Sequence, residues 1–303
     1  MKISTNVARD VIEIVESFNR LRTTENHRYA SWEFCYALAQ CMHERNGELN
    51  EGDYDYMALN LAFYLASWGM YRSSFLLQHS YKIHVKVVKL ILNDDRLWQD
   101  SVSSDIYSEL KNRINEAYEM PEVEKGATDT LLTKIVLGMT GKVVAYDRYC
   151  KAALSYLGVS SNFFGTRAKS WDKVRDGILP VFKEIIDEEE GVIATYHPYE
   201  YKDGYYVMNK EKNEEYPIEK YLDMFLFNLG RLLEELNNAV DTYPTISGDA
   251  SKIKEVKASL NVFFDNGISR DNWYVDDYCK EKANDAKKPV ANAKKIINTI
   301  LNS

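Results

Sequence analysis

Residues 133–159 read TKIVLGMTGKVVAYDRYCKAALSYLGV and show the pattern that organises this chain. Apolar residues recur at helical spacing over residues 128–138, which predicts a helix, and glycines follow it in a short connection around Gly141. Asp147 then stands where a second helix begins, and Gly158 stands where that helix stops. Two helices joined by a short turn favour an all-α fold.

The same helical periodicity extends along the rest of the 303 residues. With only 14 Gly and 6 Pro, the chain has few obligatory breaks, which favours long helices. The segment 56–78 is apolar on nearly every face, so we expect it in the interior. Pro180 should break or kink the helix that contains it. Helices are predicted over residues 6–21, 32–45, 56–78, 83–92, 104–118, 128–138, 147–158, 170–189, 217–238, 251–264 and 276–301.

Residues 196–208, YHPYEYKDGYYVM, depart from this pattern. Two short aromatic runs flank Asp203-Gly204, a pair typical of tight hairpin turns. The predicted fold is therefore all-α and multi-helical, with one small β-hairpin. Two organisations remain open: a helical domain over 1–190 followed by the hairpin and C-terminal helices over 191–303, or one continuous domain.

Composition and charge restrict the location and partners of the chain. A net charge of −8 disfavours non-specific binding to nucleic acid. The longest uncharged run, residues 56–71, is too short to span a membrane, and the N-terminus lacks the apolar core of a signal peptide. The four cysteines form no CxxC pair and suit a reducing compartment. We expect a cytoplasmic protein with no membrane partner, no metal site and no cofactor.

Asp147 is the candidate for chemistry. A carboxylate at the start of a helix caps backbone N–H groups and is favoured by the helix dipole, which is a structural role. A catalytic role is implied by a resemblance: residues 126–159 resemble the core of the helix-hairpin-helix superfamily of DNA glycosylases. The resemblance lies in Thr133, Gly141, Ala145, Asp147, Leu157 and Gly158.

In that superfamily an aspartate at a helix start stabilises positive charge on the sugar or activates the nucleophile. The resemblance implies this role for Asp147 and nucleic acid as the partner. Leu132 occupies the place of the lysine nucleophile in bifunctional members, and Lys134 lies later on the helix. These departures from the family pattern indicate a degenerate relative, for which a non-catalytic role stays open. Residues 64–72 and 145–149 resemble bacterial proteins of no known activity.

Arg72 is a second polar candidate. It ends an apolar run, and a charge that enters a core must be paired, so we expect an ion pair with Asp147. This pair would gather a polar cluster that either lines a pocket or remains structural. The other members of the cluster are Ser73, Ser74, Gln78, Tyr146 and Arg148.

Residues 72–79, RSSFLLQH, also resemble the Arg-x6-His signature of HEPN-type ribonucleases. In that family the two side chains flank the scissile phosphate, and the histidine transfers protons near neutral pH. The resemblance implies that Arg72 and His79 face one cleft.

Three functions therefore remain open, and the sequence does not decide whether the chain is an enzyme. A nucleic-acid-associated protein on a glycosylase-like scaffold predicts a positive groove. A non-enzymatic protein–protein interaction or regulatory protein predicts an exposed apolar patch of more than a few hundred Å². A HEPN-like ribonuclease is the third function. The groove would be lined by Lys134, Lys142, Arg148, Lys151 and Arg167.

Overall fold

The computed structural model describes residues 30–45, 47–72, 74–118, 127–159, 170–188, 194–241, 244 and 248–265. Helices dominate these residues and one small hairpin accompanies them, which confirms the predicted fold class. The helices predicted over 6–21 and 276–301, together with Ser73 and Arg167, lie outside the described residues.

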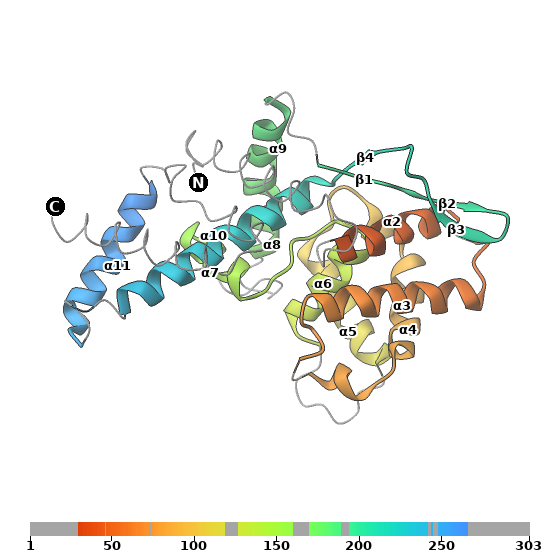
Figure 1. Ribbon diagram of the computed structural model, residues 1–303, viewed down its shortest axis with the longest axis horizontal. Coiled ribbons are helices and arrows are strands. Elements are labelled where there is room, and N and C mark those ends of the chain that lie inside the picture. The colour runs from red at the N-terminus through yellow and green to blue at the C-terminus, as the bar shows by residue number, and fades with distance from the viewer. Residues whose placement is uncertain are drawn as a thin grey trace.

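Figure 1 shows helices α2 to α6 gathered in one bundle, with the long helix α10 leading away from it beside α7, and with α11 at the far end. The α-helices are α2 (Ala30–Glu44), α3 (Glu51–Ser67), α4 (Val85–Leu92), α5 (Ser104–Ala117), α6 (Asp129–Met139), α7 (Arg148–Tyr156), α8 (Ser170–Lys173), α9 (Leu179–Glu188), α10 (Ile218–Asp241) and α11 (Ala250–Asp265). Shorter turns are η1 (Phe75–Gln78), η2 (Tyr81–His84), η3 (Asp95–Trp98) and the π-helical η4 (Val174–Ile178).

Helix α3 differs from its prediction at both ends. It begins after Asn50, whose side chain accepts hydrogen bonds from the N–H groups of Gly52 and Asp53, while the Asp53 carboxylate accepts one from the Asn50 N–H. It ends at Ser67 because Gly69 turns the chain with a φ of 75°. The single buried helix predicted over 56–78 is therefore wrong.

One face of α3 also remains exposed. Met57, Leu61 and Leu65 lie in the core, whereas Leu59 and Phe63 are exposed. Apolar residues surround the helix on all sides, but the rest of the described bundle covers only part of them. An apolar pattern alone does not reveal which faces acquire a neighbour.

Pro180 is accommodated by a change of helix type. The π-helical turn η4 directly precedes α9, and the N–H of Leu179 bonds to the carbonyl of Val174 five residues earlier. Proline cannot donate to the carbonyl four residues before it, and a wider turn provides room for its ring. The predicted break or kink thus takes the form of a π turn.

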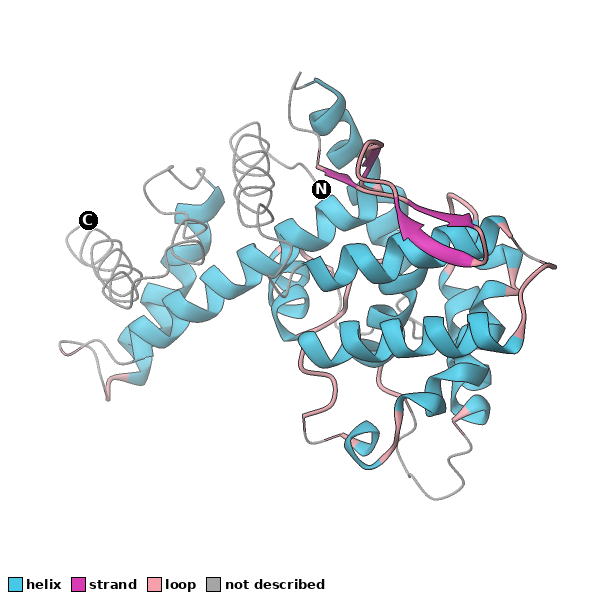
Figure 2. Cartoon of the chain, turned by 45° about the vertical axis from the view of Figure 1, so that its right-hand side comes forward, coloured by secondary structure: helices cyan, strands magenta, loops and turns pink. Residues whose placement is uncertain are grey.

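The predicted hairpin is confirmed. Strands β2 (Tyr199–Lys202) and β3 (Tyr205–Met208) pair antiparallel. Asp203 and Gly204 connect them with φ values of 52° and 88°, as a type I′ turn requires. A second pairing, β1 (Thr195–Tyr196) with β4 (Glu214–Glu215), was not predicted because strands of two residues carry no periodicity. Figure 2 shows these strands along the edge of the helical bundle.

The hairpin is anchored to α2 and α3 through Arg45. The guanidinium lies 3.3 Å over the Tyr201 ring and donates to the Tyr206 hydroxyl at 2.5 Å. That hydroxyl donates to the Asp53 carboxylate at 2.9 Å. These contacts join residues before and after position 190. The division of the chain into two domains at that position stays a prediction.

His84 is a fully buried polar residue in the helical bundle. Its two ring nitrogens each lie 2.9 Å from a tyrosine hydroxyl, those of Tyr71 and Tyr118. Burial disfavours the imidazolium and lowers the His84 pKa to about 4. The folded protein therefore keeps this ring neutral at pH values where the unfolded chain, with an ordinary histidine pKa of about 6.5, takes up a proton.

We predict that stability falls as the pH drops from about 6.5 to about 4, because only the unfolded state gains a proton at this position in that window. Across the whole window the loss attributable to His84 is about 3 kcal/mol. Urea unfolding of wild type and His84→Gln at pH 7 and pH 4.5 measures it, and the variant should show the shallower decline. The exposed His79, changed to Gln, is the control; equal declines in wild type and His84→Gln would contradict the prediction.

Candidate functional site

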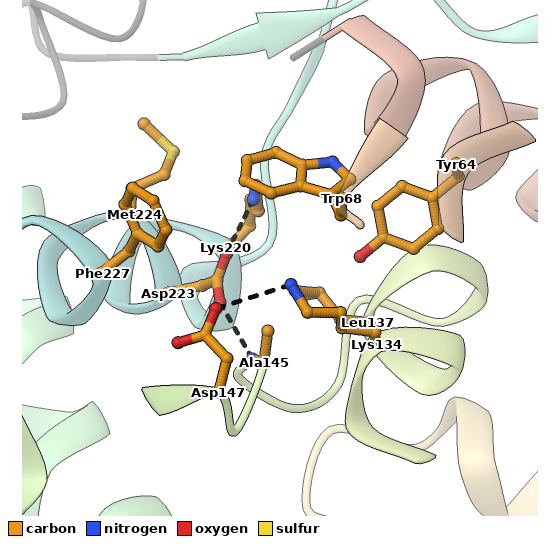
Figure 3. A pocket seen from close by; sticks show the side chains of 10 residues that line it. All are labelled: Tyr64, Trp68, Lys134, Leu137, Ala145, Asp147, Lys220, Asp223, Met224 and Phe227. Atoms are coloured by element: carbon orange, nitrogen blue, oxygen red, sulfur yellow. Dashed lines mark hydrogen bonds and ion pairs between the residues drawn. The ribbon is translucent and has the colours of Figure 1, made fainter. Parts of the chain in front are cut away.

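A recess lies where the C-terminal end of α3, helix α6, the start of α7 and the first turns of α10 meet (Figure 3). Its free volume is about 10 Å³, which is room for about one water molecule. Aromatic rings and two lysine–aspartate pairs surround it. The lining residues are Tyr64, Trp68, Lys134, Leu137, Ala145, Asp147, Lys220, Asp223, Met224 and Phe227.

Asp147 caps α7, as the sequence predicts. Its Oδ1 accepts hydrogen bonds from the N–H groups of Tyr149 at 3.0 Å and Cys150 at 3.1 Å. Its Oδ2 lies 3.5 Å from Nζ of Lys134. The side chain is 18% exposed, so the carboxylate sits at the edge of the recess rather than in a sealed core.

Lys134 reaches Asp147 from the middle of α6. Its side chain is only 5% exposed, and Nζ lies 5.1 Å from the centre of the Trp68 ring. The chain between α6 and α7 is held in place by Thr133, whose hydroxyl accepts from the Tyr146 N–H at 2.8 Å. This connection sets the distance between the lysine and the aspartate.

Gly138 has a packing role and makes no turn. It lies within α6, and a Cβ there would come within 2.4 Å of the Tyr64 ring. The left-handed turn falls instead at Gly141, with a φ of 71°. The absent side chain at 138 is what lets Tyr64 reach the recess.

The second ion pair comes from α10. Nζ of Lys220 lies 2.8 Å from Oδ2 of Asp223, and Oδ1 of Asp223 accepts from the Ala145 N–H at 2.9 Å. The Lys220 ammonium also lies 4.9 Å from the ring centre of Trp32 and 5.8 Å from that of Trp68. Both lysines are thus held by a carboxylate and by aromatic faces.

Tyr64 completes the polar lining. It is 2% exposed, and burial, together with the nearby carboxylate of Asp223, raises its pKa well above the ordinary value, so the hydroxyl stays protonated. Figure 3 shows the hydroxyl directed toward the Lys134 side chain. Within the part of the chain that the structure describes, this hydroxyl forms no hydrogen bond.

The predicted pair between Arg72 and Asp147 is wrong. The chain turns at Gly69, so Arg72 lies exposed after α3, and Lys134 of the neighbouring helix α6 takes the position beside Asp147. His79 is exposed as well, and no contact joins it to Arg72 among the described residues.

The other members of the predicted cluster also lie elsewhere. Ser74 caps η1 by accepting from the Leu76 N–H, and Gln78 is exposed at the end of that turn. Tyr146 is buried outside the recess. The Arg148 side chain is largely exposed, stacks on Tyr149 and lies 3.6 Å from Glu234.

The basic residues of the predicted groove are locally balanced by acids. Lys134 pairs with Asp147, Lys142 with Asp100 at 2.7 Å and Arg148 with Glu234. Lys151 lies over the Tyr146 ring, with Nζ 4.9 Å from its centre. This arrangement gives little support to a positive groove over α6 and α7.

Sequence reasoning missed seven lining residues: Tyr64, Trp68, Leu137, Lys220, Asp223, Met224 and Phe227. One signal was present. Lys220 and Asp223 are three residues apart at the start of a predicted helix, in a stretch that is apolar apart from Glu219, and this spacing places the two charges on one face of the helix.

Among the described residues, no three His, Cys, Asp or Glu side chains are grouped to hold a metal ion, and no helix has the length and apolar character to cross a membrane. No family model matches the chain, and no curated protein or solved structure matches it.

Proposed function

We propose that this chain is a non-enzymatic interaction protein and that α3 binds an amphipathic helix of a partner protein. The observation that carries the proposal is an exposed apolar stripe on α3, formed by Tyr56, Leu59, Phe63 and Ala66. The first three side chains are 41%, 47% and 59% exposed. Large apolar side chains that share one exposed face of a helix are typical of a binding surface.

The spacing of the stripe indicates the kind of partner. Its residues are separated by three, four and three positions, which is the a/d spacing of helices that pack in parallel or antiparallel pairs. Asn60 is the polar residue between them, and no charged residue lies between Tyr56 and Ser67. A partner helix with its own apolar seam fits this surface.

The hairpin extends the apolar surface at one end. The rings of Tyr56 and Tyr206 stack with centres 6.0 Å apart, and Tyr201 lies against Tyr206. Tyr205 and Val207 alternate to the other face of the hairpin. The stripe therefore ends against an aromatic wall, which would limit how far a bound helix extends.

A different protein is favoured over a second copy as the partner. Each copy carries a net charge of −8, so two copies repel one another, whereas a neutral or basic helix does not meet this barrier. The uncharged stripe offers no ion pairs to offset the repulsion between copies.

The glycosylase-like function stays a prediction with weaker support. Asp147 already accepts from two backbone N–H groups and faces Lys134, and the recess beside it has room for about one water molecule rather than a nucleobase. The paired basic residues of α6 and α7 add no clear phosphate-binding surface.

The proposal is tested by photo-crosslinking in the source cells, with benzoylphenylalanine at position 63 and, as control, at the exposed position 184 on α9. The expected result is a crosslink from position 63 alone to one helical segment of another protein. A crosslink to a second copy of this chain would replace the proposed partner with a dimer. Equal crosslinking at both positions would contradict the proposal.

We predict that Phe63→Glu weakens binding of the crosslinked segment by at least about 30-fold, as expected for an interface hot spot of about 2 kcal/mol. Because Phe63 is exposed, stability should change by less than about 0.5 kcal/mol. Titration of a labelled peptide of that segment measures the affinity. Leu77→Glu is the matched control, since Leu77 is also a large apolar residue, is 68% exposed and lies off α3.

A further inference from the structure

We propose that the recess between α3, α6, α7 and α10 binds the carboxylate group of a small molecule. This inference does not depend on the partner proposed for α3. It rests on two buried donors that face the recess with hydrogen-bonding capacity left over, namely the Tyr64 hydroxyl and the Lys134 ammonium.

The Tyr64 hydroxyl is the first donor. Its residue is 98% buried, and the hydroxyl forms no hydrogen bond within the described residues. The hydroxyl faces the recess, so an acceptor placed there can take its hydrogen bond. Because burial raises its pKa well above the ordinary value, the hydroxyl remains a donor at neutral pH.

The Lys134 ammonium is the second donor. It has three N–H groups. Among the described residues its polar contact is the Asp147 oxygen at 3.5 Å, and the Trp68 face lies on another side. At 3.5 Å the aspartate neutralises the charge without forming a short hydrogen bond. An acceptor placed between Lys134 and Tyr64 would therefore serve both groups.

The two aspartates do not compete for the same position. Asp147 is held by two backbone N–H groups at the positive end of α7, and Asp223 is held by Lys220 and the Ala145 N–H. The backbone N–H groups and Lys220 bond to the two carboxylates. Among the charged groups of the recess, the Lys134 ammonium forms the fewest hydrogen bonds. The Tyr64 hydroxyl and the Lys134 ammonium are both donors, and donors suit an acceptor rather than a cation.

The size and walls of the recess define the ligand further. The volume of about 10 Å³ admits one oxygen atom of a carboxylate in place of a water molecule. Trp68, Leu137, Met224 and Phe227 form the apolar part of the lining. A small carboxylate that enters with one oxygen atom, while the rest of the molecule stays outside the recess, matches the donors and the volume.

The test is thermal unfolding of the full chain in sodium acetate, with sodium chloride at equal ionic strength as reference. Acetate should raise Tm in a concentration-dependent manner. Tyr64→Phe, which removes only the hydroxyl, should weaken this effect at least tenfold, whereas Tyr146→Phe, outside the recess, should retain it. Isothermal titration of acetate into wild type and both variants checks the binding directly.

Three outcomes would overturn the proposal. If acetamide acts as strongly as acetate, the recess selects a neutral acceptor rather than an anion. If acetate has no effect beyond that of chloride, the recess holds water only. If Tyr64→Phe binds acetate as well as wild type does, acetate binds elsewhere. None of these results affects the crosslinking test of α3, so the two proposals fail separately.

Discussion

Replacing Gly230 with valine is expected to destabilise the fold by at least about 3 kcal/mol. Gly230 lies on α10 where this helix crosses α7. A Cβ at this position would come within 1.8 Å of the Tyr149 carbonyl oxygen and 2.4 Å of its carbonyl carbon. Both atoms belong to the backbone, so no rotamer change relieves the clash, and α7 has to move away from α10.

Movement of α7 would also affect the recess, because Asp147 begins that helix and faces Lys134. Urea unfolding at pH 7 measures the loss of stability. Gly177→Ala is the matched control, since an added Cβ meets no atom within 4 Å there. The control should be neutral or slightly stabilising. A loss of less than about 1 kcal/mol for Gly230→Val would contradict the close approach of the two helices.

The parts of the fold that the sequence predicted well are those with local signals. At the start of α6, the Thr128 side chain accepts a hydrogen bond from the Leu131 N–H. At the start of α7, the Asp147 side chain accepts hydrogen bonds from backbone N–H groups. Both helices therefore begin at a capping residue. The hairpin follows from Asp203-Gly204, whose positive φ values few other residue pairs adopt. Each of these features depends on residues within a few positions.

The parts that the sequence predicted wrongly or left open depend on residues far apart in the chain. Whether Phe63 is buried depends on which helices pack against α3, and its own composition does not settle that. Gly230 looks unfavourable in a helix until Tyr149 is placed beside it. Close helix crossings of this kind have no signature within one helix.

The candidate site also combines residues that the sequence predicted with residues that it did not. Asp147 and Lys134 are close in sequence and both were singled out, although the partner predicted for Asp147 was Arg72. The other half of the recess comes from α10, where Asp223 bonds to the Ala145 N–H across 78 residues of sequence. This contact forms only when α6, α7 and α10 are packed together, and the apolar periodicity of each helix does not predict how the three helices pack.

The ion pair between Lys134 and Asp147 gives the second large effect. Lys134→Met is expected to destabilise the protein by about 3 kcal/mol, because it leaves a mostly buried carboxylate without its counter-charge. Asp147→Asn keeps the cap of α7, since asparagine also accepts from backbone N–H groups, but leaves the Lys134 ammonium unpaired. Its expected loss is about 2 kcal/mol.

The double variant separates the ion pair from the other roles of both residues. If the pair is stabilised by its buried setting, the double variant should lose less than the sum of the single losses, with a coupling energy of at least about 1.5 kcal/mol. Lys111→Met with Asp129→Asn is the matched cycle. That pair is shorter, at 2.6 Å, but its side chains are 33% and 26% exposed.

The partly exposed pair should couple by less than about 1 kcal/mol despite its shorter distance, because water screens both charges. Urea unfolding of the wild type, the four single variants and the two double variants provides the comparison. Equal coupling in both cycles would mean that the recess does not strengthen the Lys134–Asp147 interaction. Asp147 would then act only as the cap of α7, and the Lys134 ammonium would have to be as well hydrated as the partly exposed Lys111.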